Sequence, residues 1–486
     1  MKSLNKAIRI SRLCKSLDMA KKLFVLVGLI GGMLAGCTLT PEYTRPARPV
    51  PADWPTGAAY QETKSVASAQ TAADLPWREF FTDKRLREII GIALNNNRDL
   101  RLAALNVERA RALYGIQRAE LLPSVNALGS MSKSRVPADL ASSGQATTNE
   151  RYDVNLGISS WEIDFFGRIR SLKDRALGEY LATDQARRSA RILLVASTAQ
   201  AYTVLAADRE NLKTAISTRE AQETTYQLIR KQYDLGIASE LDLRRVQSQV
   251  DAAKVEVARW TQVAAQDENA LNLLAGSPLP LALLPADLGD ITPPPEISAG
   301  LSSEILLQRP DVLATEHRLK AANANIGAAR AAFFPRISLT SAIGTASADL
   351  SGLFKSGSET WMFAPQIAVP IFDARTWSAY DVTKADREIA VAQYEKTIQT
   401  AFREVADALA VRGMVERQVA AQQSLVDAVA ETYRLSRVRY TLGLDSYLAV
   451  LDAQRSLYGA QQGLTSLRLA RVANRVTLYQ VLGGGI

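Results

Sequence analysis

The chain has 486 residues, of which 47% are hydrophobic and 22% are charged, which is enough to build a sizeable core. It has 58 basic and 50 acidic residues, a formal net charge of +8, but residues 1–36 hold seven of the basic ones and one acid. The remaining 51 basic and 49 acidic residues are nearly balanced, so the charge gives no argument for nucleic acid as a partner.

The N-terminal region contains a short apolar segment, residues 23–36, that follows two lysines and ends directly before Cys37. The segment is too short to cross a bilayer as a helix, which takes roughly 20 residues. A basic flank, a short apolar run and small residues before a cleavage point are typical of a secretory signal. The stretch "LAGC" resembles the lipobox of bacterial lipoproteins, in which the cysteine becomes the acylated N-terminus. We predict a covalent lipid, including palmitate, on Cys37; the alternative is an ordinary signal peptide with an incidental cysteine.

The cysteine count and the later hydropathy pattern exclude two further features. Cys14 lies in the predicted signal, so Cys37 remains as the single cysteine and no intrachain disulfide can form. No later stretch approaches 18 uninterrupted apolar residues, so the sequence predicts no transmembrane helix. Any insertion into a membrane must then use strands.

The rest of the chain is an internal duplication. The stretch "RDLRLAALNVERARALYGIQRAELLPS" from Arg98 reappears as "PDVLATEHRLKAANANIGAARAAFFPR" from Pro310, at a constant offset of 212 residues. Further on, "YQLIRKQYDLGIASELDL" from Tyr226 matches "YRLSRVRYTLGLDSYLAV" from Tyr433 at an offset of 207. The five-residue change falls between the two matches, where a surface loop can absorb it. The duplication predicts two structurally equivalent halves.

Each half is expected to start with a helix of about 22 residues that ends at Pro123 or Pro335, and to continue with two strands. Apolar and polar residues alternate over eight to eleven positions in these segments. This length and pattern match a membrane-barrel strand, although the edge of a soluble sandwich gives the same alternation. Pro365 counts against an internal position in a ladder. The apolar positions are Tyr152, Val154, Leu156 and Ile158 in the first half, and Ile337, Leu339, Ile343, Phe363, Ile367 and Val369 in the second.

Very long helices are expected after the strands, because residues 168–236 and 375–443 contain no proline and few glycines. About 65 helical residues at 1.5 Å each extend roughly 100 Å. Apolar residues from Val246 to Leu274 keep a 4-3 spacing that predicts a seam against a neighbouring helix, and Asp267 breaks it once. The charges on the other faces are interpreted as solvated surface; they include Arg187, Arg188, Arg191, Asp208, Arg209 and Glu210.

The predicted organisation therefore has five parts. They are a lipoprotein signal peptide (1–36), an acylated extended segment (37–82), a first repeat (83–276), a proline-rich linker (277–300) and a second repeat (301–486).

Four strands per chain cannot close a barrel or hide their edges in lipid. Several chains must share one barrel, and three copies would give twelve strands, within the range of known membrane barrels. The predicted fold class is therefore mainly α with β. It combines a long α-helical periplasmic barrel with a 12-stranded transmembrane β-barrel to which each chain of a homotrimer gives four strands.

From about Cys37 to its end, the sequence resembles the TolC/OprM-type outer-membrane efflux lipoproteins, also called NodT-like. The resemblance rests on "SSWEIDFFGRIR", "RPDVLATEHRLKAANANIGAARAAFFPRISLT", "VPIFDARTW" and "LDAQRSLYGAQQ". It implies a lipid-anchored trimer in the outer membrane of a Gram-negative bacterium. Its partners would be a periplasmic membrane-fusion adaptor and an inner-membrane transporter of the resistance-nodulation-division class. The function implied is the passive exit duct of a tripartite efflux pump for drugs or other small toxic compounds, gated at its periplasmic tip; the alternative is an outer-membrane channel for type I protein secretion.

The resemblance also places a pore constriction at Leu448 and Asp452, which are four residues apart and share a helix face. In a trimer they would form an apolar ring and an acidic ring, and an acidic ring favours cations. Arg245 occupies the position of Asp452 in the first repeat. It is a candidate gate latch if it pairs with Asp452; the alternative is that both are solvated helix charges.

The turns "DLGIAS" (234–239) and "TLGLDS" (441–446) connect the long helices at the end remote from the strands. Gly236 and Gly443 permit a tight reversal, and Ile237 and Leu444 offer apolar contacts beside it. We expect an adaptor to dock on these four residues; the alternative is that they only turn the chain.

An enzyme finds little support in this sequence. His317 is the single histidine, and no thiol remains free once Cys37 is acylated. Zinc sites and Ser-His or Cys-His catalysis therefore lack their parts, and no cofactor or metal is expected beyond the covalent lipid. A purely structural periplasmic coiled-coil lipoprotein is a second competitor, which the alternating segments argue against.

Overall fold

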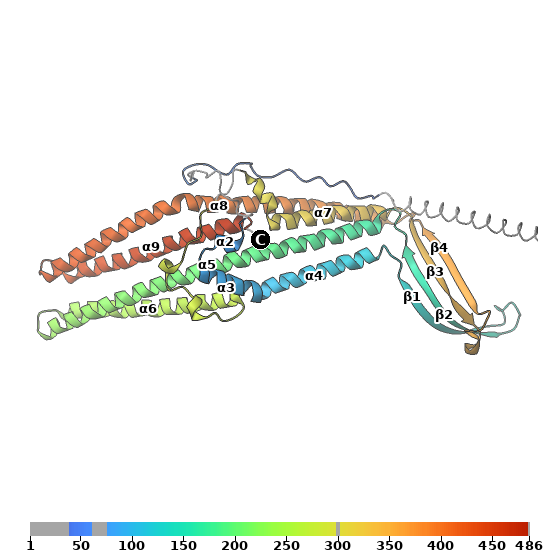
Figure 1. Ribbon diagram of the computed structural model, residues 1–486, viewed down its shortest axis with the longest axis horizontal. Coiled ribbons are helices and arrows are strands. Elements are labelled where there is room, and N and C mark those ends of the chain that lie inside the picture. Colours follow the sequence, from blue (N-terminus) through green and yellow to red (C-terminus); the bar gives the residue numbers. More distant parts are fainter. Residues whose placement is uncertain (1–37, 61–74, 298–301, 485–486) are drawn as a thin grey trace, which may run out of the picture. The chain divides into compact units, whose positions relative to one another are not determined.

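The computed structural model describes residues 38–60, 75–297 and 302–484 (Figure 1). Cys37 and the predicted signal lie outside the described residues. The contacts divide the chain into two compact units, each of which draws on both repeats. Unit 1 comprises residues up to 46, 108–182 and 316–392; unit 2 comprises residues 47–107, 183–315 and 393–486.

The helices repeat as the sequence predicts. The short helix α4 (Arg98–Ala119) and its counterpart α7 (Pro310–Ala331) have 22 residues each. The long helix α5 (Arg168–Asp234) has 67 residues and α8 (Ala374–Thr441) has 68, which at 1.5 Å per residue is roughly 100 Å. Each long helix is followed, after a tight turn, by a shorter helix. The remaining helices are α2 (Trp77–Phe80), α3 (Lys84–Asn96), α6 (Glu240–Ala275), α9 (Tyr447–Val481) and the 3-10 turns η2 (Leu281–Leu283), η3 (Leu288–Asp290), η4 (Ser303–Gln308) and η5 (Leu350–Gly352).

The strands of unit 1 form one four-stranded antiparallel sheet (Figure 1). Its order is β1 (Val125–Val136), β2 (Thr147–Glu162), β3 (Arg336–Ser347) and β4 (Glu359–Ala368). The central β2–β3 ladder joins the two repeats, and β1 and β4 are edges whose outer sides pair with no other strand among the described residues. Pro365 lies in β4, where an edge position tolerates a residue without a backbone N–H.

The register separates an apolar face of the sheet from a polar one. Ala127, Leu156, Ile343 and Trp361 stand opposite one another across the four strands. The adjacent row consists of Leu128, Asn155, Gly344 and Thr360. Because cross-strand partners share a face, the predicted alternation is confirmed. Trp361 and Ile343 are 78% and 67% exposed, so the apolar face is not covered within the chain.

A β-bulge in β2 modifies this pattern. Between Ile158 and Trp161 the strand advances three residues while β3 advances two, and Ser160 adopts a φ of 50°. The extra residue exchanges the two faces, so Trp161 lies opposite Leu339 on the apolar side. Glu162 then lies on the polar side, where it accepts two 2.8 Å hydrogen bonds from Arg168 at the start of α5. The bulge thus places Glu162 on the face of the sheet where it binds the first residue of the long helix.

In unit 1, helix α5 of the first repeat packs closely on helix α7 of the second. A Cβ on Gly178 would lie 2.9 Å from the Ala321 Cβ and from the His317 carbonyl oxygen, so only glycine fits this contact. A Cβ on Gly327 would meet Ser171 of α5 at 2.6 Å. Helix α4 is the repeat counterpart of α7, yet none of its residues is buried.

An extended segment, residues 38–46, packs along α7 in unit 1. Asn323 donates to the Pro41 carbonyl at 2.8 Å, and Arg45 donates to the carboxylate of Glu316 at 2.7 Å. Burial would raise the pKa of Glu316, but hydrogen bonds from Lys320 and Arg45 outweigh it and lower the pKa below its usual value. The segment is therefore held by an ion pair to the buried carboxylate of Glu316 and not only by apolar contact.

The core of unit 2 includes α5, α9 and the short helix α2. Phe80 of α2 stacks on Tyr479 of α9 with ring centroids 4.2 Å apart, and the Tyr479 hydroxyl donates to the Leu75 carbonyl. Among the described helices, α5 alone has an 18-residue window apolar enough to cross a membrane by composition, with a mean hydropathy of 1.3. Because 61% of that window is buried, α5 fits the core helix of a folded domain.

Asp267, which breaks the apolar spacing of α6, faces Asp208 of α5. The solvated-surface interpretation of Asp208 is therefore wrong, as is that of Arg209, which binds Glu268 at 3.2 Å. Burial raises the pKa of Asp267 to about 6, and the hydrogen bond and negative charge of Asp208 add to the increase. One Asp267 carboxylate oxygen is buried without a hydrogen-bond partner.

This pair predicts a pH dependence of stability. The folded chain holds a proton on Asp267 that the unfolded chain, with a pKa near 3.9, releases earlier. The stabilisation is therefore complete below about pH 4 and is lost as the pH rises to about 6. We expect Asp267→Asn to abolish part of the fall in thermal unfolding midpoint between pH 5 and pH 7.5, measured by circular dichroism. Asp251→Asn, on the exposed side of α6, should leave that fall unchanged; an equal effect of both variants would contradict the assignment.

Candidate functional site

The candidate site lies at the two helix turns of unit 2, which Figure 1 shows at the same end of that unit. Both Gly236 and Gly443 have a φ of 74°, a left-handed conformation that other residues rarely adopt. The Ile237 N–H donates to the Gln232 carbonyl at 2.8 Å, and the Leu444 N–H donates to the Arg439 carbonyl at 2.9 Å. These bonds are those of a Schellman ending, so both glycines are needed to stop a long helix and reverse the chain.

Large apolar side chains at both turns are exposed to solvent. Ile237 is 73% exposed and Leu444 is 62% exposed, and Leu235 and Leu442 beside them are similarly uncovered. Helix ends do not require exposed leucines, whose transfer into an apolar contact is favourable. The turns are therefore compatible with a docking site, and the docking role stays a prediction.

The two turns are held together just behind the tip by a buried cluster. Ile229 and Val246 of the first hairpin contact Tyr447, Val450 and Leu451 of the second. Burial raises the pKa of the Tyr447 hydroxyl to about 12, so it is protonated at physiological pH. The four helix ends thus move as one packed unit unless this cluster opens.

Leu448 and Asp452 lie on the other side of α9 from this cluster. Leu448 is 45% exposed, and the side chain of Asp452 is 55% exposed. Their neighbours Tyr447, Val450 and Leu451 are buried, so the exposed pair forms a separate stripe one helical turn long. This position is compatible with a lining of a pore formed by several copies, and the role stays a prediction.

The structure does not bring Arg245 to Asp452. In the part of the chain that is described, Asp452 forms its ion pair with Arg455 on the same helix, and Arg245 is exposed on α6. A latch between Arg245 and Asp452 therefore stays a prediction for contacts between copies.

An ion pair that the sequence pattern did not predict clamps the second turn. Arg439 donates to both carboxylate oxygens of Asp445 at 2.6 and 3.1 Å, and the two residues flank Gly443. The first turn has Gln232 and Ala238 at the corresponding positions, so it lacks this ion pair. The signal was present as opposite charges six residues apart around a glycine, but such a spacing also occurs in ordinary surface turns.

Comparisons with known proteins match nearly the whole chain. The sequence profile described as outer membrane efflux protein matches residues 89–277 and 301–484. The chain belongs to this family. It is 48% identical over 455 residues to the toluene efflux pump outer membrane protein TtgC of Pseudomonas putida, and the match covers 93% of each chain. The antibiotic efflux pump outer membrane protein ArpC of Pseudomonas putida is also 48% identical, with the same coverage.

A solved structure agrees with the fold of this efflux protein. The open state of the MtrE outer membrane channel of Neisseria gonorrhoeae is 38% identical, and the match has a TM-score of 0.82. It covers 92% of this chain and 98% of that channel. The protein is thus an outer-membrane channel component of an efflux system in a Gram-negative bacterium, with a large helical periplasmic part, as predicted. The relatives are efflux components, which argues against the alternative of type I protein secretion.

The predicted constriction can be tested by single-channel conductance. We expect Leu448→Ala and Asp452→Ala to raise the conductance of the closed channel by at least about twofold, because each shortens side chains at the narrowest ring. Leu425→Ala and Asp427→Ala, exposed changes of the same type on α8, are the matched controls. A closed state as tight as that of the wild type in both α9 variants would place the constriction elsewhere.

Proposed function

We propose that three copies of this efflux protein form one passive duct across the periplasm and outer membrane, with a gate at Leu448 and Asp452. The observation that carries the proposal is the four-stranded sheet, whose two outer edges are unpaired and whose apolar face is uncovered among the described residues. In hydrocarbon, the unpaired N–H and C=O groups of β1 and β4 would be costly, so each edge needs a partner strand. Three copies supply twelve strands, enough to close a barrel with a lumen.

The internal repeat indicates how neighbouring copies join. Within one chain β2 pairs with β3, and α5 packs on α7. Their counterparts in the other repeat are β4, β1, α8 and α4 respectively. The same contacts between copies would therefore pair β4 with the neighbour's β1 and pack α8 on the neighbour's α4. This arrangement covers the free strand edges and the unburied helix α4 in one step.

The repeat also suggests a residue-level contact between copies. Gly327 of α7 lies against Ser171 of α5, and their counterparts at the offsets of 212 and 207 are Gly115 of α4 and Ser378 of α8. Gly115 has open space where a side chain would be, and Ser378 is exposed. Because both residues are small, they allow α4 of one copy to approach α8 of the next as closely as α7 approaches α5.

A disulfide can test this seam. We expect Gly115→Cys combined with Ser378→Cys to form covalent trimers on oxidation, visible by non-reducing electrophoresis of heat-denatured outer membranes. The mature chain has no other cysteine than Cys37, which the lipid would block. Each single variant is the control and should stay monomeric under the same treatment. Monomers from the double variant would contradict the α4–α8 seam.

The pump partners attach at the tips in this proposal. A periplasmic membrane-fusion adaptor docks on Gly236, Ile237, Gly443 and Leu444, and an inner-membrane transporter of the resistance-nodulation-division class supplies the energy and selects the cargo. The names of TtgC and ArpC refer to toluene and to antibiotics, which supports small toxic compounds as the cargo. The protein itself performs no chemical reaction and needs no cofactor.

We also propose that Cys37 carries the lipid anchor. Leu39, two residues later, is held in place because its carbonyl accepts a hydrogen bond from Arg330 near the end of α7. Arg330 is six residues before β3, so the anchor would lie close to the sheet that enters the membrane. The barrel inserts without help from the lipid, which makes the anchor auxiliary.

Complementation of a deletion strain tests the function. The wild-type gene should restore resistance to toluene and to antibiotics. The double variant Ile237→Glu/Leu444→Glu should lower the tolerated concentration of these compounds by at least about tenfold, because charges replace the apolar docking surface. Leu228→Glu, an exposed change on α5, is the control for added charge. The Cys37→Ala protein should lack the lipid, as measured by mass spectrometry, and its strain should keep most of the wild-type resistance. Full resistance in the tip variant would show that docking lies elsewhere.

A further inference from the structure

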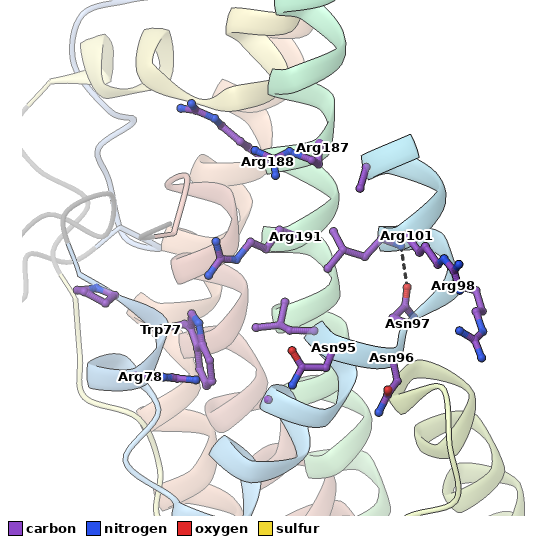
Figure 2. Close-up of a pocket in the computed structure, with 15 residues that line it drawn as sticks. Trp77, Arg78, Asn95, Asn96, Asn97, Arg98, Arg101, Arg187, Arg188 and Arg191 are labelled. Carbon is purple, nitrogen blue, oxygen red and sulfur yellow. Dashed lines mark hydrogen bonds between the residues drawn. The ribbon is translucent and has the colours of Figure 1, made fainter. Parts of the chain in front are cut away.

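A pocket in unit 2 is lined by arginines and has no role in the proposed duct. Its volume is about 1030 Å³, and it lies between α3, α4 and α5 with Trp77 of α2 as an aromatic wall (Figure 2). Among the 15 described residues that line it there is no aspartate or glutamate. The arginines are Arg78, Arg98, Arg101, Arg187, Arg188 and Arg191.

Besides Arg78, which lies over the ring of Trp77, three of these arginines form no ion pair among the described residues. Arg187 and Arg188 pair with Asp184 at 3.1 and 3.3 Å. No carboxylate in the described part of the chain pairs with Arg98, Arg101 or Arg191. Arg187 and Arg188 keep 46% and 41% of their side chains exposed, in line with the solvated-surface interpretation, and together with Arg191 they line one hollow. Such a cluster raises the free energy of the protein unless an anion is bound or the charges are screened.

The duplication shows what occupies the corresponding place in the second repeat. At the offset of 212, Gly91 of the pocket corresponds to Ser303 in the second repeat. Ser303 donates from its hydroxyl to the Pro51 carbonyl at 2.6 Å and from its N–H to the Ala52 carbonyl at 2.8 Å. The place that is open in the first repeat is therefore filled in the second by an extended polypeptide, the chain's own residues 47–54.

Further contacts extend this correspondence along the segment. Trp54 stacks on Phe402 of α8 at 5.2 Å between ring centroids, and Phe402 is the counterpart at the offset of 207 of Val195, one helical turn beyond Arg191 in α5. Arg48 pairs with Glu304 at 3.2 Å, so at this contact the segment supplies the basic residue and the second repeat supplies the acidic one. In the open pocket the signs are reversed, since the protein supplies arginines.

We propose that this pocket binds an extended acidic segment of a partner protein, in the place that residues 47–54 occupy in the other repeat. The guanidinium groups of Arg98, Arg101 and Arg191 bind the carboxylates of the segment, for which their forked geometry is suited. A second copy of residues 45–54, which carry two arginines and one aspartate, is disfavoured as the occupant, because Arg45 and Arg48 would meet like charges. The site is separate from the turns where the pump partners attach.

A charge-inverted peptide tests the proposal on the full-length protein in detergent. The probe is fluorescein-labelled EPAEPVPADW, which is residues 45–54 with both arginines changed to glutamate. We expect saturable binding by fluorescence anisotropy, weaker at higher salt. The triple variant Arg98→Gln/Arg101→Gln/Arg191→Gln should weaken it by at least about tenfold. The unaltered peptide RPARPVPADW should not bind.

The matched control is Arg244→Gln/Arg403→Gln/Arg434→Gln, which removes the same charge from exposed helix faces. It should leave the affinity within about twofold of the wild type. Both triple variants should migrate as trimers, which excludes misfolding as the cause of a loss. Equal binding to the pocket variant and the wild type would overturn the proposal. So would a pocket that binds dextran sulfate through these arginines but not the peptide, since the ligand would then be an anionic polysaccharide.

Discussion

The structure depends on one requirement: every backbone N–H and C=O that enters hydrocarbon needs a hydrogen-bond partner in the protein. A single chain meets it for β2 and β3, which pair with strands on both sides, but only on one side for β1 and β4. The same incompleteness recurs in the helices, since α7 is packed while its repeat counterpart α4 has no buried residue. A chain with unpaired edge strands and an unburied helix is best explained as one segment of a ring. Because of the duplication, the contacts within a copy and the contacts between copies can share one geometry.

The two repeats keep the same backbone and differ in what they present. The turns at Gly236 and Gly443 have the same φ, yet only the second is clamped by an arginine–aspartate pair. Strand β2 has 16 residues with a bulge, whereas β4 has ten. A groove of the second repeat is filled by the N-terminal segment, whose Arg48 pairs with Glu304, and its counterpart in the first repeat is open and lined by arginines. The duplicated backbone therefore sets the geometry of the ring, and differences in side chains give the equivalent places in the two repeats different surfaces.

Periodicity was sufficient to predict the elements, because each is long and regular. Two 22-residue helices, strands with period two and glycines at the ends of 67- and 68-residue helices all leave local signals. The misses have a different origin. The bulge at Ser160 depends on pairing with β3, which is some 180 residues away and leaves no mark in the alternation. Asp267 was visible as an irregularity, but its partner Asp208 comes from another helix. The pocket itself was also missed, because a helix pattern records which residues share a side and not which other helices lie opposite that side.

The packing at the tip restricts how any gate at Leu448 and Asp452 could open. Rotation of α9 alone would pull Tyr447, Val450 and Leu451 out of the cluster that they form with Ile229 and Val246. Burial of such side chains is worth about 1.5 to 3 kcal/mol each, so this movement would cost more than a side-chain rearrangement can supply. It would also break the 2.7 Å hydrogen bond between the buried amides of Gln222 and Gln454. The lower-cost movement keeps the two hairpins together and shifts them against a neighbouring copy, where the exposed stripe of α9 lies. Control of the channel then belongs to whatever binds several tips at once, which is what an adaptor that surrounds the duct would do.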